Sequence, residues 1–351
     1  LFPEDPLLVE DLLYQLCIEV NPSLDIHEVR LRGGEESVEE RQRSERRKPH
    51  ERLEPEEFRA HLRQRMRDLE KRLARHLVGQ PAAIATVVRA VRRAAAGLAS
   101  ERRPLASLLF MGRTGTGKTE LARALSRELY EREGTRGIVR IDCSEYALAH
   151  EYAKLIGSPP GYVGHEQGGH LTEAVANQPE SLVLFDECEK AHPRLHNLLL
   201  QILEEGELTD GKGRRVGFER TIVVLTANCG AEEISRATRP MGFGHSHLLG
   251  RETLGAIAQD SLEKRFAPEL LGRLDATVLF EELELSSIER IAAHQLTDLA
   301  RRSRSRGLPV AFTPAVARWV AGRAQAPDHG AREVRHVIER EIEPLLADRL
   351  L

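Results

Sequence analysis

Short apolar runs alternate with longer segments of helical periodicity through the middle of the chain. The runs expected as strands are Ser107–Met111, Ile138–Cys143, Ser181–Phe185, Thr221–Ala227 and Ala276–Phe280. Runs of this length, bounded by helical patterns, are typical of buried strands. Strands that alternate with helices predict a doubly wound α/β fold with a parallel sheet and right-handed crossovers.

After the last of these runs the pattern becomes mostly helical. A capping-box pattern over Ser286–Glu289 predicts a helix that reaches about Arg306. Pro309–Phe312 is expected as a short strand. Further helices are expected to begin at Thr313–Pro314 and at Gly330–Arg332. This part of the chain therefore reads as a smaller, mostly helical domain.

The amino-terminal part has a different pattern. Residues 33–57 are rich in Glu and Arg and nearly free of apolar residues, which predicts a linker that cannot bury a core. A charged amphipathic helix is expected over Phe58–Leu77, and a second helix over Ala82–Ala99. We therefore expect an amino-terminal segment and linker (1–57), a large α/β domain (58–282) and a small carboxyl-terminal domain (283–351).

Bulk composition narrows the class of protein. A hydrophobic content of 41%, a charged content of 30% and a net charge of −4 suit a soluble globular protein with no general attraction to nucleic acid or membrane. No apolar run approaches the roughly 18–20 residues of a membrane span, and no signal peptide is visible, so a cytoplasmic location is expected. The four cysteines form no CxxC pair and are expected as small buried residues, neither a disulfide framework nor a metal site.

A phosphate-binding pattern, G-x-x-x-x-G-K-[ST], follows the first expected strand. Its positions are Gly112, Arg113, Thr114, Gly115, Thr116, Gly117, Lys118 and Thr119. The glycines let backbone N–H groups turn inward around phosphate oxygens, and the helix expected over Glu120–Tyr130 adds the positive end of its dipole. Lys118 would reach the β- and γ-phosphates, and the Thr119 hydroxyl would ligate Mg²⁺. A flexible Gly/Thr turn before an ordinary helix is the alternative.

Two carboxylates end the third expected strand. Asp186 and Glu187 follow four apolar residues, so a buried strand would deliver them beside the phosphate loop. Asp186 would hold Mg²⁺, directly or through water, and Glu187 would orient and polarise the attacking water, because phosphoryl transfer depends chiefly on positioning. Asn228, at the end of the next strand, can hydrogen-bond that water or the γ-phosphate, although Asn at a strand end is also a common turn former.

A glycine- and proline-rich stretch, Gly157–Gly164, must be a loop, yet it has Tyr162 and Val163 at its tip. Exposed apolar groups on a loop suggest contact with a partner, and tyrosine offers both an apolar face and a polar end. A loop packed onto its own core is the other interpretation, and the spacing leaves both open.

At these residues the sequence resembles the Clp-type AAA+ protein unfoldase and disaggregase family, over about Leu69 to Leu346. The motifs that carry the resemblance are Val78–Gln80, the phosphate loop with Glu120–Ala122, Gly157–Gly164, Asp186–Pro193, Leu208–Arg214 and Gly330–Arg332. The chain looks most like the second ATPase module of the two-ring members, or like a single-ring relative.

The resemblance implies further roles. Val78 and Gly79 would contact the adenine of ATP, and Asn228 matches the first sensor. Arg332 matches the second sensor, which touches the γ-phosphate, and Arg273 matches the arginine finger, which reaches the ATP of a neighbouring subunit. The family acts as hexameric rings, so the resemblance implies a homo-hexamer.

The resemblance also implies a substrate. Tyr162 matches the pore tyrosine that grips polypeptide in the ring's channel, beside Val163. The sequence departs from the family mildly: Arg113 stands where proline is common, Cys188 where an aliphatic residue is common and Gly272 where asparagine is common. None of these departures removes a catalytic group.

Two alternatives to an unfoldase that acts alone stay open. Met241-Gly242-Phe243 is similar to the aliphatic-Gly-aromatic tripeptide with which some relatives dock on a barrel peptidase, although Phe243 could instead pack on its own domain. The basic stretch Arg41–Lys48 would be the only support for a remodeller of nucleic acid, and its interleaved glutamates and lack of aromatic residues argue against that.

Overall fold

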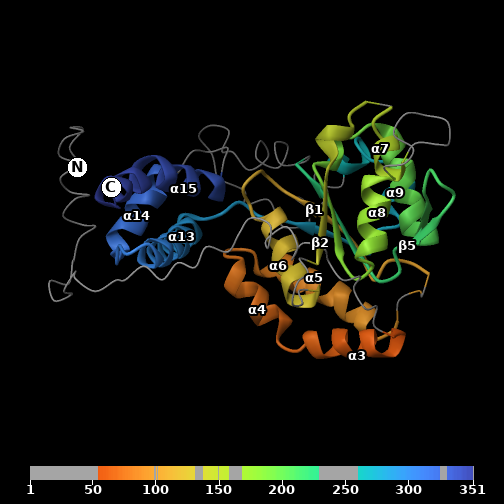
Figure 1. Ribbon diagram of the computed structural model, residues 1–351, viewed down its shortest axis with the longest axis horizontal. Helices are drawn as coiled ribbons and strands as arrows, with labels where there is room; N and C mark the ends of the chain where they lie inside the picture. The colour runs from red at the N-terminus through yellow and green to blue at the C-terminus, as the bar shows by residue number, and fades with distance from the viewer. Residues whose placement is uncertain are drawn as a thin grey trace, which may run out of the picture. The chain divides into compact units, whose positions relative to one another are not determined.

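The computed structural model describes residues 54–98, 100, 102–130, 137–148, 150–157, 168–228, 260–324 and 330–350. These residues belong to two compact units that divide between Glu282 and Leu283, and each is described by itself (Figure 1). Among the described residues, no helix is both long and apolar enough to span a membrane.

The larger unit is built on a five-stranded parallel sheet. Its strands are β1 (Ala106–Met111), β2 (Ile138–Asp142), β3 (Leu182–Asp186), β6 (Ile222–Ala227) and β7 (Ala276–Leu279). They lie in the order β2-β3-β6-β1-β7, and every neighbouring pair is parallel. All five expected strands are present, and the prediction of a doubly wound parallel sheet is confirmed.

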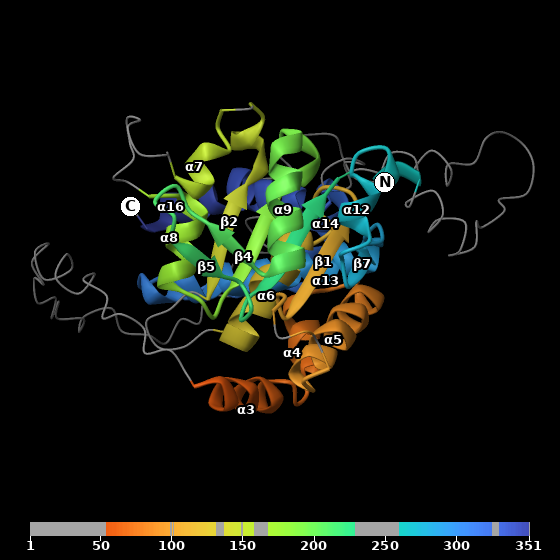
Figure 2. The same cartoon turned by 90° about the vertical axis from the view of Figure 1, so that its right-hand side faces the viewer.

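Helices cover both faces of this sheet, as Figures 1 and 2 show. On one face lie α3 (Pro55–Arg65), α4 (Leu69–His76), α5 (Pro81–Ala95) and α6 (Lys118–Tyr130); on the other lie α8 (His170–Asn177), α9 (Pro193–Glu205) and α12 (Pro268–Leu271). Alternate residues of one strand serve the two layers: Leu108 and Phe110 pack with the first set, Leu109 and Met111 with the second. Burial on both faces explains why β1 is apolar throughout.

The expected helix over Phe58–Leu77 is wrong in one respect, because it is two helices. α3 and α4 are separated by a turn in which Asp68 has a left-handed backbone with φ of 51°. The Arg72 side chain reaches back to donate to the Arg65 carbonyl at 2.5 Å, which stabilises this turn. The apolar spacing continues across the turn, since Phe58, Leu62, Leu69 and Leu73 all reach one core, so periodicity alone does not show it.

A small antiparallel hairpin follows α9. β4 (Glu207–Thr209) pairs with β5 (Arg215–Gly217), and the Asp210 carboxylate closes the turn by accepting from the N–H groups of Lys212 and Arg214. The Leu208–Arg214 motif noted in the sequence therefore forms this hairpin.

The smaller unit is helical where it is described. It contains α13 (Leu285–Ser305), α14 (Pro314–Arg323), α15 (Ala331–Val337), a π-helical segment (Ile338–Ile342) and α16 (Glu343–Leu350). α13 begins at its N-cap Glu284, not at the expected capping box, and Pro309–Phe312 forms no strand. The described part of this unit contains no other strand with which this stretch could form backbone hydrogen bonds. The predicted start of α14, with Thr313 as N-cap and Pro314 at the first position, is confirmed.

Candidate active site

The phosphate-binding pattern forms a tight loop between β1 and α6, at the carboxyl end of the sheet. Two glycines are required there for steric reasons. A Cβ at Gly112 would stand 2.7 Å from the Phe280 carbonyl oxygen, and one at Gly117, where φ is +105°, would stand 2.5 Å from a methyl carbon of Leu77. At Gly112 the close atoms are the backbone and Cβ of Phe280, which cannot easily move, and at Gly117 the positive φ disfavours any side chain. The sequence pattern therefore has a structural cause.

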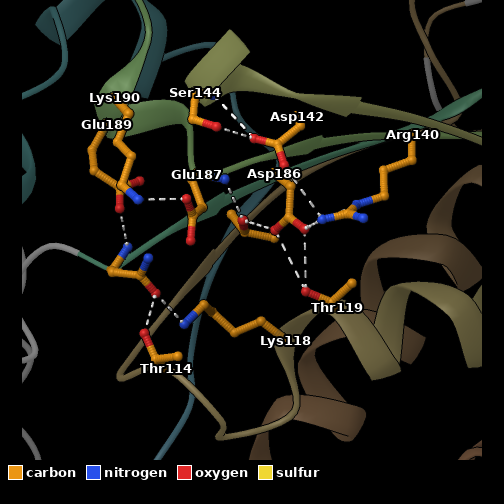
Figure 3. A network of polar contacts seen from close by, with 12 residues as sticks. Thr114, Lys118, Thr119, Arg140, Asp142, Ser144, Asp186, Glu187, Glu189 and Lys190 are labelled. Carbon is orange, nitrogen blue, oxygen red and sulfur yellow. Dashed lines mark hydrogen bonds and ion pairs between the residues drawn. The ribbon is translucent and has the colours of Figure 1, made fainter. Parts of the chain in front are cut away.

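Lys118 is buried at the first position of α6 (Figure 3), and the loop holds its ammonium group. Nζ donates to the carbonyl oxygens of Gly112 at 2.6 Å and Arg113 at 2.8 Å. It also donates to the Asn228 side-chain oxygen at 2.9 Å. The lysine therefore lies inside the loop's curve and is joined to the end of β6.

Asp186, at the end of β3, is also buried and receives bonds from three elements (Figure 3). Its Oδ1 accepts from the Thr226 hydroxyl at 2.6 Å, and its Oδ2 accepts from the Arg140 guanidinium at 2.8 Å. The Thr119 hydroxyl lies 3.4 Å from Oδ1. The Asp186 carboxylate and the Thr119 hydroxyl lie close together and are hard oxygen donors of the kind that Mg²⁺ prefers. The ion pair with Arg140 shows that a cation can bind at this carboxylate.

Glu187 follows directly and has a left-handed backbone, with φ of 59° and ψ of 47°. That conformation is costly for a residue other than glycine and persists where neighbours hold it. Its N–H donates to the Thr226 hydroxyl at 2.9 Å, and its carboxylate accepts from Lys190 at 2.6 Å, across the 3₁₀ turn η3 (Cys188–Lys190). Bonding to Glu187 raises the pKa of the Lys190 ammonium above its ordinary value.

Asn228 joins the phosphate loop to the acidic segment. Its side-chain oxygen accepts from Lys118, and also lies 3.5 Å from the Thr114 hydroxyl. Its backbone N–H donates to the Glu189 carboxylate at 3.0 Å. Asn228 therefore bonds both to the loop lysine and to the turn that follows Glu187.

Gln80 fixes the Val78–Gly79 segment against the phosphate loop. Its side-chain amide donates to the carbonyls of Thr116 at 3.2 Å and Glu281 at 2.8 Å, and its side-chain oxygen accepts from the Glu281 N–H at 3.1 Å. Val78 itself is buried, and Gly79 has a positive φ of 79°. The two residues expected at the adenine thus lie on a segment tied to the loop.

Arg273 lies at the other end of the sheet. Its carbonyl accepts from the Ser107 hydroxyl near the start of β1, whereas the phosphate loop follows the end of that strand. The Arg273 guanidinium forms an ion pair with Glu204 of α9. Within the described part of the larger unit, Arg273 is therefore not a member of the group around Lys118.

The remaining expected site residues lie either in the smaller unit or outside the described residues. Arg332 is exposed in the first turn of α15, in the smaller unit. Tyr162 and Val163, and the tripeptide Met241-Gly242-Phe243, lie outside the described residues.

Four residues that the sequence reasoning did not single out belong to this network: Arg140, Glu189, Lys190 and Thr226. Glu189 and Lys190 lie inside the Asp186–Pro193 motif, although no role was predicted for them. Arg140 gave no signal, because it lies in the middle of β2, the first strand in the sheet order. Thr226 did give one, because it is the only polar residue in β6. A polar residue near the carboxyl end of an otherwise apolar central strand points to the same edge as the phosphate loop.

Two cysteines lie beneath the acidic segment. Cys143 and Cys188 are buried and free, with their sulfur atoms 3.6 Å apart, and burial raises the pKa of the Cys188 thiol. For these two residues the prediction of small buried side chains is confirmed, while Cys17 and Cys229 lie outside the described residues.

Comparisons with known proteins match both units. A family model described as the AAA domain (Cdc48 subfamily) matches residues 103–277, and one described as the carboxyl-terminal, D2-small domain of ClpB protein matches residues 283–351. The chain is 44% identical to a chaperone protein ClpB of Rhodopirellula baltica over 283 residues, which is 81% of this chain and 31% of the relative.

Other relatives give the same result. The chain is 41% identical to a chaperone protein ClpB of Oceanobacillus iheyensis over 288 residues, 82% of this chain and 35% of the relative. It is 40% identical to the chloroplastic chaperone protein ClpC3 of Oryza sativa subsp. japonica over 289 residues, 82% of this chain and 31% of the relative. The chain thus spans about a third of the length of the curated relatives it matches.

Proposed function

The chain belongs to the Clp-type AAA+ family, and from this we propose that it is an ATPase module that uses ATP hydrolysis to unfold or disaggregate other polypeptides. The observation that carries the proposal is the meeting of Lys118, Asp186, Glu187 and Asn228 at the carboxyl ends of three adjacent strands. An anion-binding loop beside a positioned acidic pair is what phosphoryl transfer to water requires.

Each residue has a proposed role. The phosphate loop from Gly112 to Thr119 binds the triphosphate, with Lys118 at the β- and γ-phosphates. Glu187 orients and polarises the attacking water as general base, and Asn228 senses the γ-phosphate. Val78 and Gly79 contact the adenine, supported by the bonds that Gln80 makes to the loop.

The Thr119 hydroxyl and the Asp186 carboxylate would hold Mg²⁺, because they offer oxygen donors on facing elements. When bound there, the ion neutralises charge on the phosphate oxygens. When the ion binds, the bond from Arg140 to Asp186 Oδ2 would break, and the bond from Thr226 to Oδ1 would keep the carboxylate in place.

A second subunit completes the site in this proposal. Arg273 lies at the opposite end of its own sheet, which supports a role as an arginine finger toward the ATP of a neighbouring copy. Hydrolysis would then require a homo-hexameric ring. Arg332 is the proposed second sensor.

Polypeptide is the proposed substrate, gripped in the ring's channel by Tyr162 and Val163. Docking to a barrel peptidase through Met241-Gly242-Phe243 is the alternative use of the same ATPase, and a cytoplasmic location suits both. A nucleic-acid substrate is not proposed, because only the basic stretch in residues 41–48 would favour it.

The test is ATP-dependent unfolding of a stable reporter protein by the full chain, with ATP turnover measured alongside. Wild type should turn over ATP and unfold the reporter. Tyr162→Ala should keep ATP turnover and lose unfolding. If wild type turns over ATP but does not unfold the reporter, the proposed coupling to unfolding is wrong. If wild type shows no turnover at all, the proposed ATPase activity is wrong as well. Adding a barrel peptidase, with Phe243→Ala as control, separates the alternative.

A further inference from the structure

Thr226 is the one polar residue in β6, whose sequence is Ile-Val-Val-Leu-Thr-Ala, and its side chain is buried with 1% of its surface exposed. Its hydroxyl bonds to both members of the acidic pair on the neighbouring strand. It donates to Asp186 Oδ1 at 2.6 Å and accepts from the Glu187 N–H at 2.9 Å.

The register of the sheet explains why one hydroxyl can reach both groups. β3 and β6 are parallel, with Phe185 opposite Leu225, so Thr226 comes level with the residue that follows Phe185. A hydroxyl has one proton to donate and two lone pairs that accept, so the threonine can serve a carboxylate and an N–H group at once. An apolar residue of the same shape could serve neither.

For Asp186, the bond fixes which oxygen faces the sheet. Oδ1 is held by Thr226 inside the protein, so Oδ2 is the oxygen that Arg140 contacts at the edge of the site. A short bond from a buried hydroxyl to a carboxylate is strong, because few competing water molecules reach it. The orientation of the carboxylate therefore depends on Thr226.

For Glu187, the bond holds the backbone. The residue has a left-handed φ of 59° although it is not a glycine, and its N–H donates to the Thr226 hydroxyl. Without an acceptor there, this N–H would lose its partner, and the turn would gain by relaxing toward an ordinary backbone. The direction in which the Glu187 side chain leaves the strand depends on that turn.

We propose that Thr226 is a positioning residue for ATP hydrolysis, which sets Asp186 and Glu187 together through its single hydroxyl. The proposal rests on the proposed function, because it assigns no chemistry to Thr226 itself. A misplaced general base slows the chemical step more than it weakens nucleotide binding, which the loop provides. The effect should therefore be found in kcat and not in nucleotide affinity.

The sheet supplies a matched control. Thr221 is also fully buried, directly precedes β6, and donates its hydroxyl proton to the Phe218 carbonyl at 2.8 Å, at the opposite end of the strand. Thr226→Val and Thr221→Val thus remove the same group from equally buried positions, and only the first lies at the acidic pair. Thr226→Ser keeps the hydroxyl and tests rescue.

The experiment measures kcat and KM for ATP in the full chain, together with binding of a fluorescent ATP analogue and thermal unfolding. Thr226→Val should lower kcat about 10- to 100-fold, the usual effect of removing a group that orients an active residue, while the analogue still binds. Thr226→Ser should retain most of the wild-type kcat, and Thr221→Val should retain all of it.

A wild-type kcat in folded Thr226→Val overturns the proposal, and so does an equal loss in Thr221→Val. If Thr226→Val does not fold, Thr226→Ala replaces it under the same criteria. A wild-type chain that binds the analogue but shows no turnover overturns the proposed function, and the role of Thr226 with it.

Discussion

The two ends of the parallel sheet both contain buried polar groups, but they use them differently. The carboxyl-end cluster consists of Lys118, Asp186, Glu187, Thr226 and Asn228, and the amino-end cluster consists of Tyr130, Ser107, Glu180, Arg220 and Asp275. They lie on the same strands or on segments that flank them, and share one hydrophobic core on each face. We expect the amino-end cluster to stabilise the fold and the carboxyl-end cluster to orient the site residues.

At the amino end, opposite charges join elements that must stay together. Glu180 and Arg220 form an ion pair at 3.0 Å, and each side chain is 11% exposed. The Arg220 guanidinium also lies over the Phe58 ring of α3, 5.4 Å from its centroid. Asp275 accepts from both the N–H and the hydroxyl of Ser107, which ties the start of β7 to β1. These contacts hold α3 and the start of β7 against the rest of the larger unit.

At the carboxyl end, the bonds run in series through groups that both donate and accept. The Asn228 amide oxygen holds Lys118, its N–H binds Glu189, and the Thr226 hydroxyl joins Asp186 to Glu187. Such a series orients side chains toward the loop. We therefore expect the hydrogen bonds to contribute mainly stability in the amino-end cluster and mainly orientation of the site residues in the carboxyl-end cluster. Exchanging Glu for Gln in each cluster tests that difference.

The largest effect is expected for Glu187→Gln. Loss of the general base should reduce ATP turnover by about 10²- to 10⁴-fold, while ATP binding and the free energy of unfolding stay near those of wild type. Turnover and binding assays with chemical denaturation check this. Unchanged turnover would remove Glu187 from its proposed role.

The same exchange at the amino end, Glu180→Gln, should do the reverse. It leaves Arg220 buried with a weaker partner, so the free energy of unfolding should fall by about 1–3 kcal/mol. Turnover per folded molecule should not change. Urea denaturation with an activity assay below the transition measures both, and a turnover defect in folded protein would break the distinction between the clusters.

A smaller effect is expected for Tyr130→Phe. The Tyr130 hydroxyl is buried and donates to the Arg220 carbonyl at 3.2 Å, so its removal should cost about 1 kcal/mol of unfolding free energy. ATP turnover should be that of wild type. A loss of several kcal/mol in the same denaturation assay would show that the hydroxyl supports more than one bond.

The smallest effect concerns pH. Burial opposes ionisation of Glu128, but hydrogen bonds from Arg72 and His76 outweigh it and lower the pKa of this carboxyl below its ordinary 4.5. Folding therefore favours the ionised form, and the stabilisation is present above pH 4.5 and lost as pH falls below it. Glu128→Gln should flatten the fall in unfolding free energy over that range, measured by denaturation at a series of pH values. An unchanged slope would assign the acid sensitivity to other groups.

The sequence was sufficient to predict the five strands and the phosphate loop, because burial and steric need leave clear patterns. Runs such as Ser107–Met111 are apolar because both faces are covered. Gly112 is a glycine because the Phe280 backbone approaches it, and Gly117 because its φ of +105° disfavours a side chain. The acidic pair was predictable because Asp186 and Glu187 end a buried strand of the sheet that also leads into the phosphate loop, whereas the same pair without that loop would be interpreted as a solvated strand end.

Other features could not be predicted, because their causes are not local. The turn at Asp68 interrupts an apolar spacing that continues unchanged. Thr226 is the only polar residue in β6, but threonine is common in strands, and only the strand register places its hydroxyl beside Asp186. Arg140 pairs with a carboxylate 46 residues away in the chain. The roles of the expected site residues, Arg273 and Arg332 included, stay predictions.

The bonds of Gln80 also bear on the order in which the protein is made. They join the Thr116 carbonyl to Glu281, which lies 201 positions after Gln80 in the chain, and β7 completes the sheet just before Glu281. A ribosome therefore finishes the phosphate loop long before it supplies Glu281, and contacts of such sequence separation slow folding. A nascent chain stalled before Glu281 has a phosphate loop that is complete in sequence, but Gln80 lacks one of the two segments to which it bonds.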